Sequence, residues 1–119
     1  MAAGAATDVP TDRATHATPD STKQAARALA KGALAILPTD TVFGICADIR
    51  VDEAVLAIYT AKGGQKSSPL QLLFPFGSAN LANYAELTTS ARALVEALGP
   101  GAWTVITRAR DGWDSPALA

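Results

Sequence analysis

Length, charge and cysteine content exclude several classes of protein for this chain. Its 119 residues suffice for one small domain, and 49% of them are hydrophobic. The formal net charge of −1 predicts no overall attraction to nucleic acid or to an anionic membrane surface. A single cysteine excludes an intrachain disulfide and a cysteine-based zinc site. No apolar run is long enough to span a bilayer and no signal peptide is recognisable, so we expect a cytoplasmic protein with no membrane partner.

The N-terminal region is predicted to be a flexible tail over residues 1–19, followed by a domain over residues 20–119. The tail is rich in Ala, Thr, Asp and Pro and shows no hydrophobic periodicity. It contains His16, the only histidine, which argues against a histidine base or metal ligand. Ser21 followed by Gln24 is a capping-box pattern, and it predicts a helix that begins there and ends near Gly32.

The next segments alternate between apolar runs and helical patterns. Residues 33–37 (ALAIL) and 44–49 (GICADI) are short and apolar, which predicts two buried strands. Asp52 is expected to cap a helix that continues to Lys62. A glycine- and serine-rich loop then leads to residues 70–74 (LQLLF), predicted to be a third buried strand.

The last third of the chain continues this alternation. Thr88 or Thr89 is expected to open a helix, whose apolar residues recur with i, i+3, i+4, i+7 spacing until Gly99. Residues 103–108 (WTVITR) alternate in polarity, as a strand does. Alternating strands and helices indicate the α/β class. Because only about four strands are predicted and no closing helix follows, we expect part of a domain rather than a finished one.

Three small polar residues follow the first predicted strand, in the segment PTDTVFG at 38–44. Ligands of open α/β sheets bind at strand ends, and the hydroxyls of Thr39 and Thr41 can both donate and accept hydrogen bonds. In an extended segment these two side chains face one side and Asp40 the other. They could therefore hold a polar small molecule, or they could form a turn that satisfies its own backbone.

The loop KGGQKSSP at 62–69 is a second candidate. Lys62 and Lys66 are point charges suited to phosphate, and glycines allow a backbone to approach a ligand closely. The spacing is not that of a P-loop, and no G-x-G-x-x-G occurs in the chain. The alternative is a solvated helix C-terminus at which Lys62 complements the helix dipole.

Taken together, these segments resemble the YrdC/Sua5 family of L-threonylcarbamoyladenylate synthases. Members carry a strand ending in P-T-D-T-[VL]-[YF]-G, a helix ending in K-G-R, a loop leading to P-L, and P-G-P-x-T before a strand. Here the corresponding stretches are LPTDTVFG, AIYTAKGG, SPLQLLF and LGPGAWTVI, in the same order. The resemblance implies a YrdC-like twisted mixed sheet with flanking helices, of which residues 23–108 match the first part and which is apparently truncated.

The resemblance also implies a function. Family members form threonylcarbamoyl-AMP and pyrophosphate from L-threonine, bicarbonate and ATP, a nucleotidyl transfer that serves t6A modification of adenosine 37 in tRNA. It implies ATP as a substrate, Mg²⁺ as a cofactor, tRNA and other t6A-pathway proteins as partners, and no residue as a metal ligand. Thr39 and Thr41 would bind the substrate threonine beside Asp40 and Gly44. Lys62 would be catalytic, and Lys62, Lys66 and Ser68 would contact the nucleotide.

Two departures from the family pattern favour an alternative. The arginine of K-G-R is Gly64 here, which supplies no guanidinium fork, although Lys66 follows two residues later. The family's later A-V-R-V-P-like and S-x-N motifs do not occur in these 119 residues. The alternative function is a truncated, non-catalytic YrdC-like module that binds RNA or a partner protein.

Overall fold

The computed structural model describes residues 19–66, 68–77 and 79–119. These residues divide into two compact units, one of Met1–Leu70 with Ser115–Ala119 and one of Gln71–Asp114. The tail predicted over residues 1–19 lies outside the described residues except for position 19, which belongs to the first helix. Within the described ranges, no helix has the length and apolar character needed to cross a membrane.

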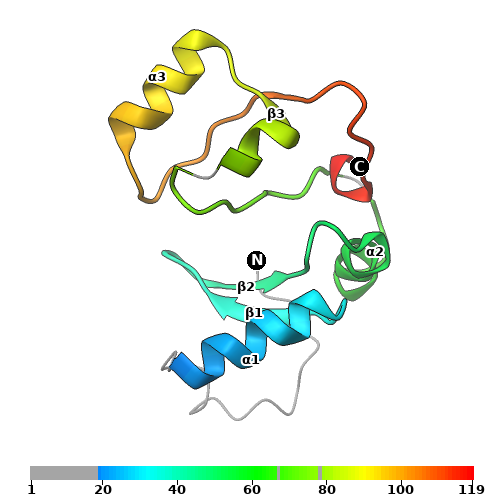
Figure 1. Cartoon of the computed structure of the whole chain (residues 1–119). Helices are drawn as coiled ribbons and strands as arrows, with labels where there is room; N and C mark the ends of the chain where they lie inside the picture. Colours follow the sequence, from blue (N-terminus) through cyan, green and yellow to red (C-terminus); the bar gives the residue numbers. More distant parts are fainter. Residues whose placement is uncertain (1–18, 67, 78) are drawn as a thin grey trace. The chain divides into compact units, whose positions relative to one another are not determined.

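The first unit combines a hairpin with two helices and a short 3₁₀ turn (Figure 1). Strands β1 and β2 pair antiparallel, with Ala35 opposite Cys46 and Pro38 opposite Phe43. Helix α1 contacts β1, and α2 contacts the 3₁₀ turn η2. The elements of this unit are α1 (Pro19–Ala30), β1 (Ala35–Pro38), β2 (Phe43–Cys46), α2 (Asp52–Ala61) and η2 (Pro116–Leu118).

Helix α1 begins earlier than its capping-box pattern predicted. Ser21 lies inside the helix rather than at its N-cap, and Asp20 occupies the first turn, where a carboxylate favours the helix dipole. The predicted end is confirmed. Gly32 has φ +83°, its N–H bonds to the carbonyl of Leu29 at 2.9 Å, and the N–H of Ala33 bonds to Ala28 at 3.0 Å. This pair of bonds is a Schellman motif.

Helix α2 supplies most of the buried side chains of the first unit. Its N-cap position is Val51, which makes no side-chain cap, so the expectation that Asp52 caps the helix is wrong and Asp52 lies in the first turn instead. The buried apolar residues recur at helical spacing and share the core with η2. They are Ala54, Val55, Ile58, Tyr59 and Ala117. Burying one aliphatic side chain of this size contributes about 1.5–3 kcal/mol, so this helix face dominates the packing.

The second unit contains one helix and a very short hairpin. The Oγ1 of Thr88 accepts a hydrogen bond from the N–H of Ala91 at 3.1 Å, which confirms the predicted start of a helix at Thr88 or Thr89. Tyr84 packs edge-on against Trp113, with ring centroids 5.2 Å apart. The elements of this unit are η1 (Ala79–Asn83), β3 (Ala85–Glu86), α3 (Thr89–Leu98) and β4 (Arg108–Ala109).

Of the two further predicted strands, the one over residues 70–74 does not form and the one over residues 103–108 forms only at its last residue. Residues 70–74 alternate between exposed and half-buried side chains but pair with no strand among the described residues. Of residues 103–108 only Arg108 is in a strand, where it pairs antiparallel with Glu86. A strand needs backbone hydrogen bonds to a neighbouring strand. The side chains of Gln71 and Thr104 bond at 2.6 Å, but no backbone ladder joins the two segments in the described chain.

The sheet arrangement is simpler than the mixed sheet that the family resemblance implied. The described strands form two separate two-stranded antiparallel sheets, β1–β2 and β3–β4. Helices and strands nevertheless occur together in each unit, and the α/β class is confirmed.

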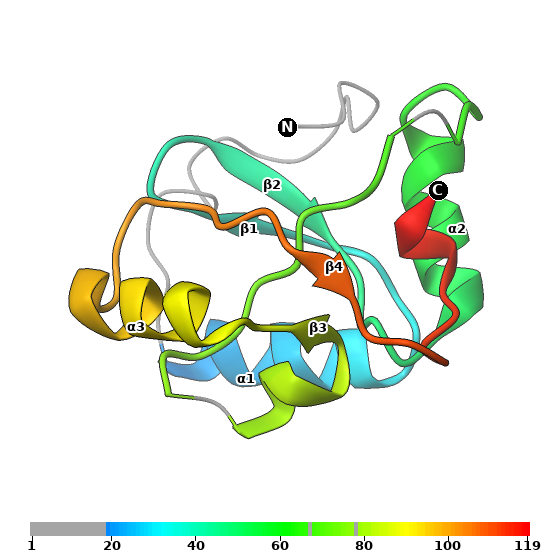
Figure 2. The same ribbon diagram turned by 90° about the horizontal axis from the view of Figure 1, so that it is seen from above.

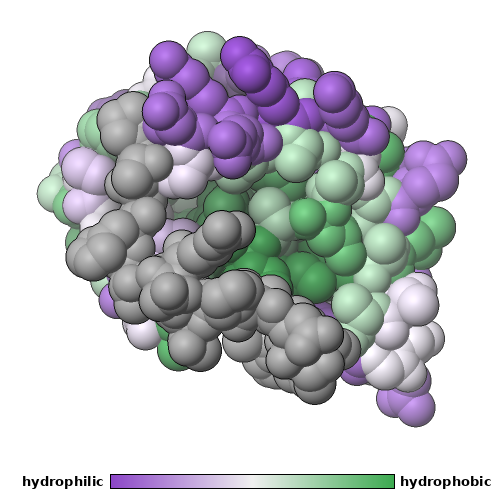
Figure 3. Space-filling view, turned by 90° about the horizontal axis from the view of Figure 1, so that it is seen from below, coloured by the Kyte–Doolittle hydropathy of each residue, from purple (hydrophilic) through white to green (hydrophobic). Residues whose placement is uncertain are grey.

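Apolar side chains remain exposed in both units. On the face shown in Figure 3, apolar residues gather at the centre, and hydrophilic residues lie along the upper edge of this area. Large apolar residues that are more than two-fifths exposed include Val42 and Leu56 in the first unit. In the second unit Leu73 is 72% exposed and Ile106 is 96% exposed.

Candidate functional site

The turn that joins β1 to β2 contains the threonines singled out from the sequence. The hydroxyl of Thr39 donates to the carbonyl of Val42 and accepts from the N–H of Val42 at 3.2 Å. The N–H of Thr39 bonds to the same carbonyl at 3.1 Å. Thr39 therefore satisfies the backbone of its own turn, which was the alternative prediction for this segment.

The hydroxyl of Thr41 lies beside that of Thr39. Their Oγ1 atoms are 3.5 Å apart, and both residues are exposed, as is Asp40. The buried Gly44 lies behind the turn. A Cβ at this glycine would come within 3.5 Å of the Cγ2 of Thr39, so the backbone passes close to the threonine. The turn presents two adjacent hydroxyls and a carboxylate to solvent.

The glycines after α2 end that helix. The N–H of Gly63 bonds to the carbonyl of Thr60 at 3.2 Å, and the N–H of Gly64 bonds to Tyr59 at 2.8 Å. Both glycines have positive φ, +105° and +82°. This is a second Schellman motif, and it places Lys62 at the C-cap, where a cation complements the helix dipole.

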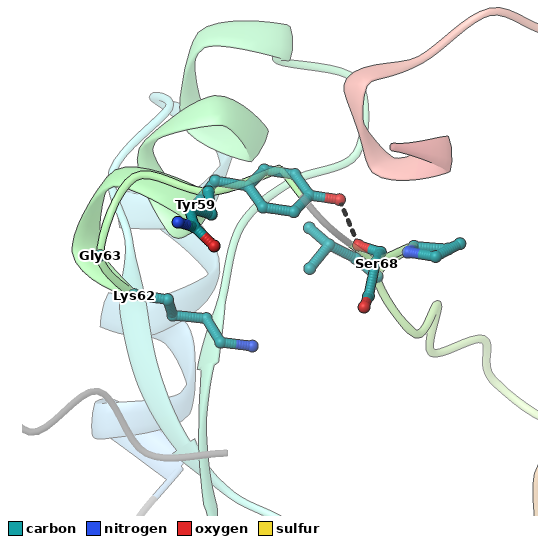
Figure 4. Close-up of a pocket in the computed structure, with 7 residues that line it drawn as sticks. Tyr59, Lys62, Gly63 and Ser68 are labelled. Atoms are coloured by element: carbon teal, nitrogen blue, oxygen red, sulfur yellow. Dashed lines mark hydrogen bonds between the residues drawn. The ribbon is translucent and has the colours of Figure 1, made fainter.

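A pocket of about 350 Å³ opens beside this helix end (Figure 4). Tyr59 forms one wall, and its hydroxyl donates to the carbonyl of Ser68 at 2.9 Å. Figure 4 shows the side chain of Lys62 extending from the end of α2 in the same direction as the Tyr59 ring. The lining residues are Tyr59, Lys62, Gly63, Gln65, Ser68, Pro69 and Leu70.

The described lining of the pocket carries one charge. Lys62 is the charged side chain among the described lining residues, and Lys66 is not one of them. Burial raises the pKa of the Tyr59 phenol, which keeps the hydroxyl protonated and able to donate near neutral pH. The pocket can therefore offer a cation, the backbone of the turn at Gly63 and neutral hydrogen-bonding groups to a ligand.

The residues of this pocket do not fit a protein-held magnesium ion. Magnesium is bound in proteins mainly through carboxylates together with substrate phosphates, and the described lining contains no carboxylate. Across the described ranges, no three His, Cys, Asp or Glu side chains are grouped closely enough to hold a metal ion.

The structure groups some predicted site residues and separates others. Lys62 and Ser68 share the pocket, while Thr39 and Thr41 share the turn. The hairpin turn and α2 lie at opposite ends of the first unit, because the chain leaves the far end of β2 to enter α2 (Figures 1 and 2). The candidate site of the described residues thus consists of a hydroxyl turn and a cationic pocket.

Two features of the first unit, one in the pocket and one before α2, were missed by sequence reasoning. Tyr59 was not predicted to take part in a site, although a buried tyrosine usually bonds its hydroxyl to a partner. Asp48 accepts hydrogen bonds from both the backbone N–H and the Nε of Arg50, each at 2.9 Å, and this turn precedes α2. The Arg50 guanidinium holds the pKa of the Asp48 carboxyl below its usual value.

Comparisons with known proteins agree on one family. The family model for the Sua5/YciO/YrdC domain, described as telomere recombination, matches residues 27–118. No solved structure matches the chain.

Curated relatives match part of the chain at moderate identity. A putative threonylcarbamoyl-AMP synthase of Mycobacterium tuberculosis (strain CDC 1551 / Oshkosh) is 34% identical over 79 residues, which cover 66% of this chain and 36% of that protein. A protein of the same description from Mycobacterium leprae (strain TN) is 35% identical over 82 residues, covering 69% of this chain and 37% of that protein. The chain thus spans little more than a third of the length of these relatives.

Proposed function

The chain belongs to the Sua5/YciO/YrdC family, and from that premise we propose that it acts as an L-threonylcarbamoyladenylate synthase. Its substrates would be L-threonine, bicarbonate and ATP as the magnesium complex, and its products threonylcarbamoyl-AMP and pyrophosphate. The relatives described as putative threonylcarbamoyl-AMP synthases support this proposal. A place in tRNA t6A modification, in the cytoplasm and beside other proteins of that pathway, is part of the same proposal.

The observation that carries the proposal is the paired hydroxyls of Thr39 and Thr41. Their Oγ1 atoms lie 3.5 Å apart in a turn whose backbone Thr39 itself holds together. A turn fixed in this way loses little conformational entropy when a small polar ligand binds. We assign Thr41, whose hydroxyl is exposed, to contact the substrate threonine, and Thr39 to hold Thr41 in place.

The pocket at the end of α2 is suited to the phosphates of the nucleotide. Lys62 supplies a positive charge, while Gly63 and Ser68 present backbone and hydroxyl groups. The C-terminal end of a helix carries partial negative charge and so disfavours an anion. Lys62 must offset this negative charge. Lys66, which is exposed and follows shortly after Lys62 in the sequence, would add to the positive electrostatic potential.

The chemistry requires positioning more than acid–base catalysis. The amine of threonine and bicarbonate give a carbamate and water. A carbamate oxygen then attacks the α-phosphorus of ATP, the bond from that phosphorus to the bridging oxygen breaks, and pyrophosphate leaves. In phosphoryl transfer of this kind, catalysis comes from alignment of the reactants and from electrostatic stabilisation. Lys62 would stabilise the charge that develops on the leaving pyrophosphate, whereas no step is assigned to a protein-held metal.

One observation favours the alternative of a non-catalytic binding module. Gly64 replaces the arginine of the family pattern and adopts φ +82°, a conformation that an arginine would occupy only with strain. Loss of one such charged donor commonly lowers a rate by about 10²–10³-fold. An RNA- or protein-binding role would therefore be retained more easily than synthesis.

Pyrophosphate release by the purified chain tests the proposal. With ATP present, we expect release that requires both threonine and bicarbonate, and none when either is omitted. Serine in place of threonine is a matched control for recognition of the substrate methyl group. Release that is independent of threonine would indicate ATP hydrolysis instead, and no release by a folded chain that binds RNA would support the alternative.

A further inference from the structure

We propose that Tyr59 is a positioning residue, which closes the loop of residues 62–68 at both ends and thereby sets the arrangement of Lys62 and Ser68 in the pocket. At the start of the loop, the Tyr59 carbonyl accepts the N–H of Gly64 at 2.8 Å. At its end, the Tyr59 hydroxyl donates to the carbonyl of Ser68 at 2.9 Å (Figure 4). One residue of α2 thus bonds to the loop at Gly64 and at Ser68. Residue 67 of the loop lies outside the described residues.

The rigidity of Tyr59 makes this closure effective. Its side chain is 6% exposed and is packed in the small core of the first unit with Val55, Ile58 and Ala117. The described loop residues that it holds are themselves exposed. Because its ring is held in the core, Tyr59 can fix the position of Ser68 relative to α2.

A second anchor lies just beyond the loop. The N–H of Leu70 bonds to the carbonyl of Ala117 at 2.8 Å, so the chain that leaves the pocket is tied to η2. Ala117 is 2% exposed and lies against α2. Ser68 is thus held by the Tyr59 hydroxyl, and Leu70 is held by η2.

Tyr59→Phe removes the hydroxyl and keeps the ring, so it tests the closure without emptying the core. Amide hydrogen exchange of the full chain without ligand is the first measurement. We expect the N–H groups of Gly64 and Leu70 to exchange about three- to tenfold faster, as loss of one hydrogen bond implies. The N–H of Val55, which bonds to the carbonyl of the N-cap residue Val51 at the start of α2, should be unaffected.

The second measurement separates positioning from a purely structural role, and it rests on the proposed function. In the pyrophosphate-release assay we expect Tyr59→Phe to raise the KM for ATP about three- to tenfold and to leave the KM for threonine unchanged. The two effects should differ because neither Thr39 nor Thr41 is among the residues that line the pocket. Tyr84→Phe, the same chemical change in the second unit, is the matched control and should leave both values unchanged.

Each result decides the role of Tyr59. Faster amide exchange confined to Gly64 and Leu70, together with a KM change for ATP alone, supports a positioning role for Tyr59. Unchanged exchange, an equal increase at Val55, or an equal rise in both KM values would overturn it. A wild-type chain that releases no pyrophosphate contradicts the proposed function instead, and the exchange rates then still decide whether Tyr59 closes the loop.

Discussion

The hydroxyl oxygens of Thr39 and Thr41 lie 3.5 Å apart, yet the two residues have different tasks. Thr39 bonds to both the N–H and the carbonyl of Val42 and so holds the turn, whereas Thr41 presents its hydroxyl to solvent. We propose that this division underlies recognition of the substrate threonine. The roles of the two residues can therefore be tested separately by mutation.

Isosteric replacement of each threonine should affect different properties. Thr39→Val removes the hydroxyl that satisfies the turn and should lower the free energy of unfolding by about 0.5–1.5 kcal/mol. Thr41→Val should change that free energy by less than about 0.5 kcal/mol, because the side chain is exposed. Under the proposed function it should raise the KM for threonine. Denaturant unfolding and pyrophosphate release measure the two effects, and a Thr41→Val protein with unaltered KM would contradict the assignment.

The two lysines should contribute unequally to nucleotide binding. Lys62 lines the pocket and Lys66 does not, so Lys62→Met should weaken ATP binding about 10- to 100-fold, the expected loss of one charge-assisted contact. Lys66→Met, the matched loss of charge, should weaken it less than about threefold. Isothermal titration with ATP provides the comparison. Equal losses would show that Lys66 takes over the part of the absent arginine.

Replacing Gly64 by the arginine of the family pattern should lower the stability of this chain. Gly64 has φ +82°, and a Cβ added to it would meet no neighbouring atom within 4 Å, so space is available but the backbone conformation is unfavourable. Gly64→Arg should reduce the free energy of unfolding by about 1–2 kcal/mol, measured by denaturant unfolding. Gln65→Arg adds the same side chain one residue later and serves as the control, with a change below about 0.5 kcal/mol. Similar losses for both variants would argue against backbone strain as the cause.

The Asp48–Arg50 turn should make stability sensitive to acid. Since the pKa of Asp48 is lower in the folded chain than the unfolded value of 3.8, its stabilising effect is fully present above that value. The effect is lost as pH falls through the lower folded pKa. Asp48→Asn keeps an oxygen that can accept the Arg50 N–H but removes the charge, and it should flatten this part of the profile. Thermal unfolding between pH 2 and about pH 6 measures the difference, and parallel profiles would contradict it.

The small core should make α2 sensitive to truncation of its buried face. Ile58 is 6% exposed, and Ile58→Ala should lower the free energy of unfolding by about 2–5 kcal/mol. Leu56 is 45% exposed on the opposite face of the same helix, so Leu56→Ala should cost less than about 1 kcal/mol. Denaturant unfolding of the two variants provides the test, and equal costs would place the core elsewhere.

Local signals in the sequence predicted much of the fold. Gly32 and Thr88 marked a helix end and a helix start correctly, because caps depend on a few neighbouring residues and on the positive φ that glycine tolerates. The pair Gly63–Gly64 was recognised as a loop but not as a Schellman motif. The start of α1 was placed too late in the chain, since Ser21 suits a cap and Asp20 suits the first turn.

The sequence by itself determined the family, the helix ends and the hydroxyl and lysine segments, all of which depend on residues close together in the chain. Only the tertiary structure decided which segments find partners. Residues 70–74 have the composition of a strand but no strand beside them in the described chain, because pairing depends on distant residues. The bond from Tyr59 to Ser68 likewise depends on how α2 packs, since a side chain reaches a carbonyl nine residues away only when the intervening loop folds back.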